Sequence, residues 1–216
     1  MPYAILISVA LIFLVLMPAF FRLQKQGRKG LSLVFKAAST LIAAGFALHA
    51  CLQGADAYAA LILAGLCVCV LADVVLDIRF VAGGALFFAG HVLYVTALGL
   101  YRQPSWWCLT VFVLAGGGLA FFGSHYRADA PAKHLVICAA IYGVALAALL
   151  GFSIPLPFLA FSRRSLLAAL GAALFVASDL TLCHNILRDK PVPYRFVSLG
   201  MYYMGQLLLG LSAFSA

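Results

Sequence analysis

Long apolar segments, separated by short polar connections, cover almost all of this 216-residue chain. Hydrophobic residues make up 66% of it and charged residues 9%, whereas a soluble domain carries roughly 25% charged residues. A helix needs about 20 apolar residues to cross a bilayer. The sequence therefore predicts an all-α, polytopic membrane protein with one transmembrane domain, 1–216. We place its eight spanning helices at 3–21, 33–51, 57–77, 80–100, 105–123, 134–152, 165–187 and 195–215.

The basic residues predict how these helices are oriented, because Lys and Arg collect in the loops on the cytoplasmic side. The loops on one side contain Arg22, Lys25, Arg28, Lys29, Arg79, Arg127, Lys133, Arg188, Lys190 and Arg195, and the opposite loops contain Arg102, Arg163 and Arg164. We therefore expect both termini to lie on the side of the membrane opposite the cytoplasm. We expect this membrane to be the inner (cytoplasmic) membrane of a bacterium. The net charge of +8 is a topology signal on this interpretation and does not indicate nucleic acid. The first helix is expected to be retained, because its basic residues follow its apolar core, whereas those of a signal peptide precede it.

Carboxylates interrupt two of the apolar segments. The third segment ends in LCVCVLADVVLDIRF and contains Asp73 and Asp77, and the seventh contains Asp179, although the chain has only six acidic residues. An ionisable group inside a bilayer costs a few kcal/mol at least, and such groups mostly face a protein interior or a cavity. Asp73 and Asp179 have no basic residue within one helical turn, so we predict a functional role for both. Asp77 lies beside Arg79, which leaves an interfacial ion pair as an alternative.

Other polar residues are predicted at a similar depth in neighbouring helices. His91 and Tyr94 share a helix face, as do Tyr202 and Gln206, because residues three or four apart point the same way. These observations predict one polar cavity that opens toward the cytoplasm. Simpler alternatives remain for some residues: a lysine that reaches the lipid head groups, a histidine used in packing, or tyrosines at the membrane interface. The candidate binding residues are Lys36, Tyr94, Ser178, Tyr202, Tyr203, Gln206, Asp77 and Asn185.

A weak internal repeat runs through the chain. LADVVL (71–76) resembles ASDLTL (177–182), and FFAGHVLY (87–94) resembles YYMGQLLL (202–209). These matches would pair the third and fourth helices with the seventh and eighth, in the same direction through the membrane. The sequence thus suggests two parallel four-helix repeats, 1–103 and 104–216, and a site between such repeats is common in membrane proteins.

The cysteines do not suggest a metal centre or disulfides. All six of them lie in or near apolar runs, where free cysteine behaves as a small hydrophobic residue. Cys67 and Cys69 point to different faces of one helix. No cluster of His, Cys or Glu has the spacing of metal ligands, so we expect neither a metal nor another cofactor.

These segments resemble the YhhN family of lysoplasmalogenase-like membrane proteins. The resemblance covers 36–206 and depends on the order of five motifs, since each alone is weak. Two positions depart from the family pattern: Ala37 stands where proline is expected, and Ala72 where glycine is expected. The motifs here are FKAAST with Lys36, LADVVL with Asp73, FFAGHVLY with His91, FVASDLTL with Asp179, and MYYMGQLL with Tyr202.

The resemblance implies hydrolysis of the vinyl ether bond of a lysoplasmalogen, a lysophospholipid, to a fatty aldehyde and a glycerophospho-ethanolamine or -choline. Such a reaction needs a general acid and an anion that stabilises a cation and activates water. Our hypothesis is that Asp73 and Asp179 divide these roles, in an order left open, with His91 as orienting group or proton relay. Lys36 would hold the phosphate, and Tyr94, Tyr202, Ser178 and Gln206 would bind water or the glycerol backbone.

Two other functions stay open. A parallel repeat with carboxylates at mid-depth is also compatible with a small proton-coupled transporter. A transporter needs polar groups that are reachable from both sides, and the predicted outer half has few. A hydrolase of another ether lipid or lysolipid is the second alternative, although the chain has no Gly-x-Ser-x-Gly motif.

Overall fold

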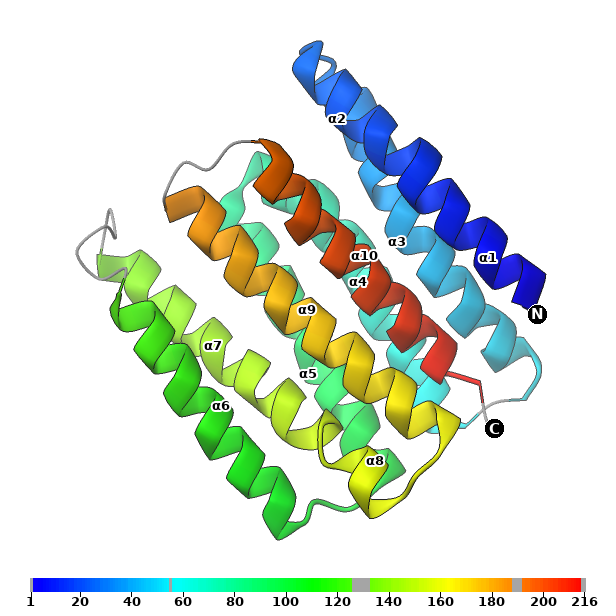
Figure 1. Ribbon diagram of the computed structural model, residues 1–216, viewed down its shortest axis with the longest axis vertical. Helices are drawn as coiled ribbons and strands as arrows, with labels where there is room; N and C mark the ends of the chain where they lie inside the picture. The colour runs from blue at the N-terminus through cyan, green and yellow to red at the C-terminus, as the bar shows by residue number, and fades with distance from the viewer. Residues whose placement is uncertain (1, 55, 126–132, 188–191, 215–216) are drawn as a thin grey trace.

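The computed structural model describes residues 2–54, 56–125, 133–187 and 192–214 (Figure 1). Helices account for almost all of this part of the chain, and it contains no strand. The elements are α1 (Pro2–Ala10), the π-helical turn η1 (Leu11–Leu16), α2 (Met17–Lys25), α3 (Lys29–Leu52), α4 (Ala57–Ile78), α5 (Phe80–Tyr101), α6 (Trp106–Ser124), α7 (Lys133–Ser153), α8 (Leu156–Leu159), α9 (Arg163–Leu187) and α10 (Val192–Ser212). The all-α prediction is confirmed.

The long helices match the predicted spans to within a few residues. Within the described residues, seven helices are long and apolar enough to cross a membrane, the first being the continuous segment Pro2–Lys25. α10 is the remaining long helix, and it contains the polar side chains of Tyr202, Tyr203 and Gln206. The chain is an integral membrane protein, while the count of eight spans and the outward position of both termini stay predictions.

Helix ends follow from local chemistry. Asp56 precedes α4, and its Oδ1 accepts a hydrogen bond from the Ala59 amide at 3.2 Å, which satisfies a free backbone donor of the first turn. Gly27 and Gly54 follow α2 and α3 with φ of 75° and 83°, a left-handed conformation that side chains disfavour. α4 and α5 are separated by a single extended residue, Arg79, so the two helices form a tight hairpin.

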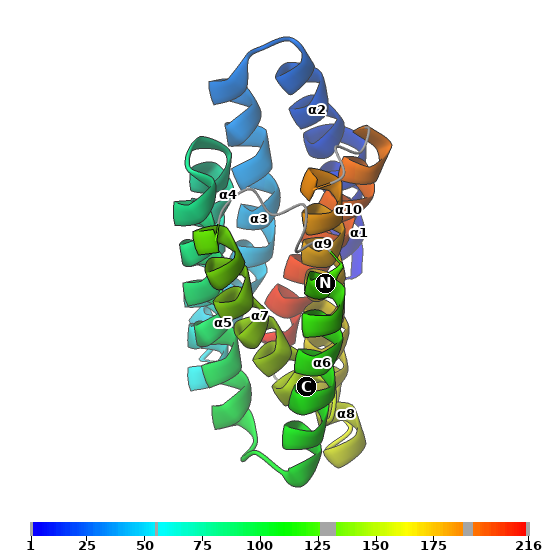
Figure 2. The same cartoon turned by 90° about the vertical axis from the view of Figure 1, so that its left-hand side faces the viewer.

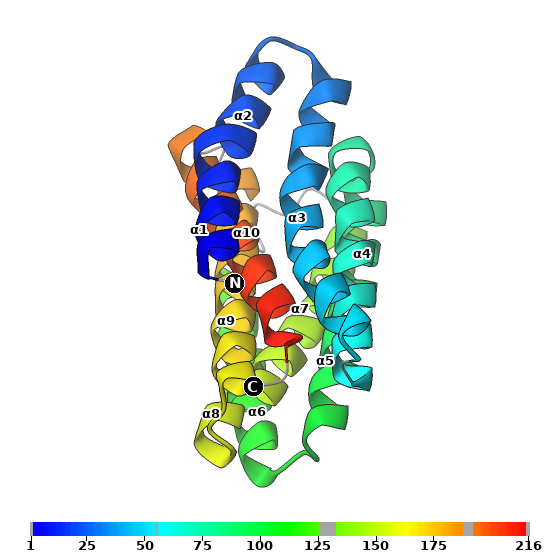
Figure 3. The same ribbon diagram turned by 90° about the vertical axis from the view of Figure 1, so that its right-hand side faces the viewer.

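Six of the long helices form a closed ring. α3 packs on α4, α4 on α5, α5 on α7, α7 on α9, α9 on α10, and α10 on α3. Figures 2 and 3 show α4 and α5 on one side of this ring and α9 and α10 on the other, with α3 and α7 between them. The first helical segment packs on α3, and α6 packs on α7. Large apolar side chains such as Leu14, Val34 and Phe121 are exposed on the outside, as expected of a surface that faces lipid.

Small residues allow the ring helices to approach closely, as is usual where helices associate in lipid. A methyl group added at Gly205 of α10 would lie 2.9 Å from the Gly171 carbonyl oxygen and 3.0 Å from the Phe175 backbone nitrogen. Both obstacles are backbone atoms of α9 and cannot rotate away. The α9–α10 contact therefore depends on glycine at this position.

Replacing Gly205 tests this contact. We expect Gly205→Ala to destabilise the protein by about 1–3 kcal/mol, the usual cost of overpacking, measured as a lower thermal midpoint in detergent. Gly117→Ala on α6 is the matched control, because an added methyl there meets nothing within 4 Å. Equal midpoints for the two variants would contradict the proposed tight contact.

An ion pair joins three elements at the end of the ring opposite the α4–α5 turn. Arg164 at the start of α9 is only 5% exposed. Its Nη1 donates to Asp56 Oδ2 at 2.5 Å, and its Nη2 donates to the Ala213 carbonyl at 3.3 Å. The guanidinium also lies over the rings of Tyr58 and Tyr101, at 4.6 and 5.3 Å from their centroids. We call Arg164 and these four residues the outer clasp.

The outer clasp changes the interpretation of the loop charges. Arg164 opposes the predicted orientation by charge count, but it is buried and paired and so is not a free loop charge. Arg127, Arg188, Lys190 and the side chain of Lys133 lie outside the described residues. The basic bias toward the α2–α3 and α4–α5 turns remains, with Arg22, Arg28 and Arg79 on that side.

The outer clasp predicts a loss of stability in acid. Partial burial by itself raises the pKa of Asp56, but the hydrogen bonds from Arg164 and the Ala59 amide, with the guanidinium charge, outweigh it and lower that pKa from its ordinary value. A lowered folded-state pKa means that the carboxylate stabilises the fold above the unfolded-state pKa of about 3.9 and loses this effect as the pH falls through the folded-state value.

We therefore expect Asp56→Asn to lower the thermal midpoint at neutral pH, and the gap to the wild type to close between about pH 4 and pH 2. Thermal unfolding in detergent across this pH range measures the difference in thermal midpoint between the two proteins. A gap that is constant with pH would show that the charge of Asp56 is not what stabilises this end of the ring.

Candidate functional site

Polar side chains from all six ring helices meet inside the ring. Hydrogen bonds, ring contacts or charge interactions connect neighbours in this group, which we call the polar cluster. It consists of Lys36 and Thr40 of α3, Asp73 and Asp77 of α4, His91 and Tyr94 of α5, Tyr142 of α7, Asp179 of α9, and Tyr202 and Gln206 of α10.

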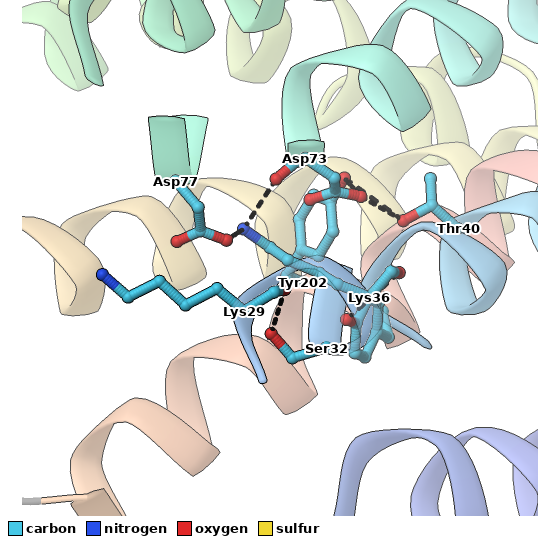
Figure 4. A network of polar contacts seen from close by, with 8 residues as sticks. Lys29, Ser32, Lys36, Thr40, Asp73, Asp77 and Tyr202 are labelled. Carbon is cyan, nitrogen blue, oxygen red and sulfur yellow. Dashed lines mark hydrogen bonds and ion pairs between the residues drawn. The ribbon is translucent and has the colours of Figure 1, made fainter. Parts of the chain in front are cut away.

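Asp73 lies at the centre of the polar cluster and is 1% exposed. Its Oδ2 accepts hydrogen bonds from Thr40 Oγ1 at 2.5 Å and from the Tyr202 hydroxyl at 2.9 Å (Figure 4). Gln206 Nε2 donates to the Tyr202 oxygen at 3.1 Å, and the Tyr94 hydroxyl donates to Gln206 Oε1 at 2.8 Å. Tyr202, one of the two donors to Asp73, is thus itself held in place by a hydrogen-bonded chain.

Lys36 points into the ring and not toward the lipid that surrounds the protein. Its Nζ donates to the carbonyl oxygen of Asp73 at 3.0 Å and to Asp77 Oδ2 at 2.8 Å (Figure 4). Lys36 is 6% exposed, so in this structure it pairs inside the ring and does not extend to the head groups of the surrounding bilayer. Asp77 is paired with Lys36 of α3, which the sequence alone did not indicate.

Asp179 is the second carboxylate that faces the ring interior, and it is partly exposed. The Tyr142 hydroxyl donates to Asp179 Oδ2 at 2.6 Å. Within the described residues, no other side-chain donor lies within hydrogen-bond distance of it. Asp179 and Asp73 are close enough for their charges to interact. The two carboxylates therefore belong to one site but have different surroundings.

His91 carries a buried nitrogen that has no partner in the described part of the chain. Its Nδ1 lies 2.6 Å from the Phe87 carbonyl oxygen, which can only accept, so Nδ1 carries a hydrogen. In the neutral ring Nε2 is then an acceptor, and it is buried without a donor. The ring lies 4.6 Å from that of Phe175 and 5.3 Å from that of Tyr142. Such a nitrogen is suited to bind a water or a substrate hydroxyl.

Three predicted binding residues lie outside the polar cluster or at its edge. Ser178 Oγ donates to the Ser198 carbonyl at 2.9 Å, and Ser198 Oγ donates back to the Ser178 carbonyl at 3.0 Å, so these hydroxyls join α9 to α10. The Tyr203 hydroxyl donates to the Lys36 carbonyl at 3.3 Å. Asn185 is 4% exposed, and its amide finds no partner among the described residues. Substrate contacts by these residues stay predictions.

Sequence reasoning missed two members of the polar cluster. Thr40 lies one turn after Lys36 on the same face of α3, and this spacing would have indicated it. Tyr142 lies in an apolar stretch of α7. Its hydroxyl is a weak indication in the sequence that this residue faces the polar cluster. Both residues donate to the carboxylates that the sequence singled out.

The fold and the polar cluster define an integral membrane protein with two carboxylates enclosed by its helices. Residues 31–213 match the YhhN family, and the chain belongs to this family. It is also 34% identical over 138 residues to a lysoplasmalogenase, TMEM86B, of Sus scrofa; the match covers 62% of this chain and 53% of the relative. The chain thus spans about half the length of that protein. No solved structure matches it.

The pairing of Lys36 with Asp77 predicts energetic coupling between the two side chains. Lys36→Met and Asp77→Asn should each destabilise the fold, because each leaves a partly buried charge without its partner. The double variant should lose less than the sum, with a coupling on the order of 1 kcal/mol. The free energy of unfolding in detergent is measured for the wild type, the two single variants and the double variant.

Arg102→Met combined with Asp77→Asn is the control pair, since Arg102 lies at the other end of the bundle and is exposed. The effects of these two control substitutions on the free energy of unfolding should add. Additive effects for Lys36 and Asp77 as well would mean that the 2.8 Å contact contributes no net stability.

Proposed function

We propose that this protein is a membrane hydrolase that cleaves the vinyl ether bond of lysoplasmalogens. Its family and its similarity to a lysoplasmalogenase support this function. The observation that carries the proposal is the pair Asp73 and Asp179, two interacting carboxylates enclosed by apolar helices. The products are a fatty aldehyde and a glycerophospho-ethanolamine or -choline.

The chemistry requires one proton donor and one anion. The acid transfers its proton to the β-carbon of the vinyl ether, and a C–H bond forms while the double bond becomes an oxocarbenium ion. Water adds to the cationic carbon and gives up a proton, which restores the acid. The resulting hemiacetal breaks its C–O bond, with a proton passing to the glycerol oxygen, and releases the aldehyde. Asp73 and Asp179 fill the two roles in our proposal.

The remaining polar groups bind and orient. His91 Nε2 accepts no hydrogen bond from the described residues and would hold the attacking water or a glycerol hydroxyl. Tyr94, Tyr202 and Gln206 would fix the geometry of Asp73 through their hydrogen bonds. No cofactor is required, because protonation and hydration supply the whole reaction.

Lys36 and Asp77 are placed to recognise the head group. They form an ion pair in which Asp77 is the more exposed partner, at 30% against 7% for the side chains. An incoming phosphate would compete with Asp77 for the lysine, and the freed carboxylate would receive the ammonium of the head group. In this proposal the substrate would enter at the α4–α5 turn, on the side we predict to be cytoplasmic.

A proton-coupled transporter is the main alternative, because it too uses carboxylates inside a helical ring. The outer clasp argues against it. Arg164 and Asp56 pair with each other and the arginine is buried, so these charges do not continue the polar cluster toward the other side. A hydrolase of another ether lipid or lysolipid would use the same site and differs only in the substrate.

The first test is product analysis by mass spectrometry, with the purified protein in detergent. A lysoplasmalogen should give a fatty aldehyde, and its ester-linked lyso counterpart should give no product. Cleavage of the ester alone would identify a lysophospholipase, and no product from either lipid would remove the proposed function.

The two aspartates are tested by substitution. Asp73→Asn and Asp179→Asn should each lower turnover at least a hundredfold, on the order of the contribution of general acid–base catalysis. Asp56→Asn is the matched control, since this aspartate lies in the outer clasp, and it should keep its activity. Thermal midpoints verify that each variant is folded. Near-normal turnover in Asp73→Asn or Asp179→Asn would remove that aspartate from the mechanism.

A further inference from the structure

The helix contacts repeat when the two halves of the chain are exchanged. In this exchange α2 corresponds to α6, α3 to α7, α4 to α9, and α5 to α10. The α4–α5 contact then becomes α9–α10, α3–α4 becomes α7–α9, α3–α10 becomes α7–α5, and α2–α3 becomes α6–α7. All eight of these contacts occur in the described part of the structure. This arrangement is what two parallel repeats around a pseudo-twofold axis would produce.

Close contacts between backbones repeat in the same way. A methyl group added at Gly65 would meet the Tyr94 ring, and one added at Gly171 would meet Leu209. A shift of 106 residues carries Gly65 to Gly171, and a shift of 115 residues carries Tyr94 to Leu209. The shifts of 115 and 106 residues differ by nine, so the second half has nine more residues between these contacting positions than the first half. Within each helix the register is constant.

The same two shifts reproduce a second contact. A methyl group added at Gly90 would meet Cys69 Sγ at 2.8 Å, and one added at Gly205 would meet the Phe175 backbone at 3.0 Å. The shift of 106 carries Cys69 to Phe175, and the shift of 115 carries Gly90 to Gly205. Two separate contacts at one register are difficult to attribute to short apolar strings that match by chance.

Equivalent positions also surround the two carboxylates. The shift of 106 carries Asp73 to Asp179. On the helix that precedes each in the ring, Thr40 donates to Asp73 Oδ2 and Tyr142 donates to Asp179 Oδ2. Each carboxylate thus has one hydroxyl donor in a corresponding place.

The second donor of Asp73 has no counterpart. Tyr202 donates to Asp73 at 2.9 Å, and the shift of 115 makes Phe87 its equivalent. The two rings are in edge-to-face contact, with centroids 5.8 Å apart and planes at 90°, so these equivalent residues lie next to each other, as expected beside a pseudo-twofold axis. Phenylalanine has no hydroxyl, so the second half lacks this hydrogen bond.

The ammonium near Asp73 is not repeated either. If Thr40 and Tyr142 are equivalent, Lys36 corresponds to Cys138, an exposed thiol. Asp73 therefore has two hydroxyl donors and a nearby cation, and Asp179 has one hydroxyl donor. When two carboxylates interact, a proton shared between them resides on the one that has fewer groups to stabilise its negative charge.

We propose that 1–103 and 104–216 are parallel repeats, and that Phe87, by lacking the hydroxyl of Tyr202, leaves Asp179 as the carboxylic acid and Asp73 as the carboxylate. This assignment rests on the proposed function, in which Asp179 then protonates the vinyl ether and Asp73 stabilises the cation. Phe87 is a positioning residue, because it acts through Asp179. The titratable groups near Asp179 are Tyr142 of α7, Asp73 and Cys69 of α4, and Cys183 of α9. His91 of α5 contacts the ring of Tyr142.

Infrared spectroscopy of the wild-type protein in lipid nanodiscs tests the assignment without any substrate. A protonated aspartate gives a carbonyl band whose frequency depends on its hydrogen bonds. At neutral pH we expect such a band, and we expect Tyr142→Phe to shift it while Thr40→Val leaves it in place. A band that responds to Thr40→Val alone, or no band at all, would overturn the proposal.

Phe87→Tyr tests the role of the missing hydroxyl. The new donor would stabilise the carboxylate form of Asp179, so the pH above which vinyl ether cleavage declines should fall by about one unit. Phe87→Leu is the control, because it changes the ring but adds no donor and should keep the wild-type pH. Equal pH profiles for all three proteins would overturn the proposal. Wild-type protein that does not cleave the vinyl ether would instead reject the proposed function, and the infrared result would still decide where the proton resides.

Discussion

A carboxylate inside a membrane must receive its hydrogen-bond donors from the protein, because the lipid offers none. Asp73 meets this constraint with donors from two other helices, Thr40 of α3 and Tyr202 of α10, and with the Lys36 ammonium nearby. These contacts connect helices that are far apart in sequence. The closed ring is therefore both the scaffold of the site and a consequence of burying its charge.

The two ends of the ring differ in how their charges are used. At one end Lys36 and Asp77 form a contact in which the carboxylate is partly exposed, and in our proposal a zwitterionic head group would exchange with it. At the other end Arg164 is buried against Asp56, Tyr58 and Tyr101. Access from one end would suit the proposed hydrolysis, in which the acyl-like chain would remain among apolar helix faces.

The proposed repeat explains how one ring can provide two carboxylates with different properties. Duplication would place Asp73 and Asp179 in equivalent positions, with Thr40 and Tyr142 as equivalent donors. Differences at single positions, Tyr202 against Phe87 and Lys36 against Cys138, then separate their chemistry. Acid and anion would thus arise from one local geometry by the removal of a hydroxyl and a cation from one half.

The sequence by itself determined the all-helical class, the helix positions and the inward side chains, because hydrophobicity over about 20 residues and buried charges are local signals. The order of its motifs also indicated the family. Only the tertiary structure decided the partners: Asp77 with Lys36, Asp179 with Tyr142, and Asp56 with Arg164. Each pair joins helices separated by 37 to 108 residues, and which helices become neighbours depends on packing around the whole ring.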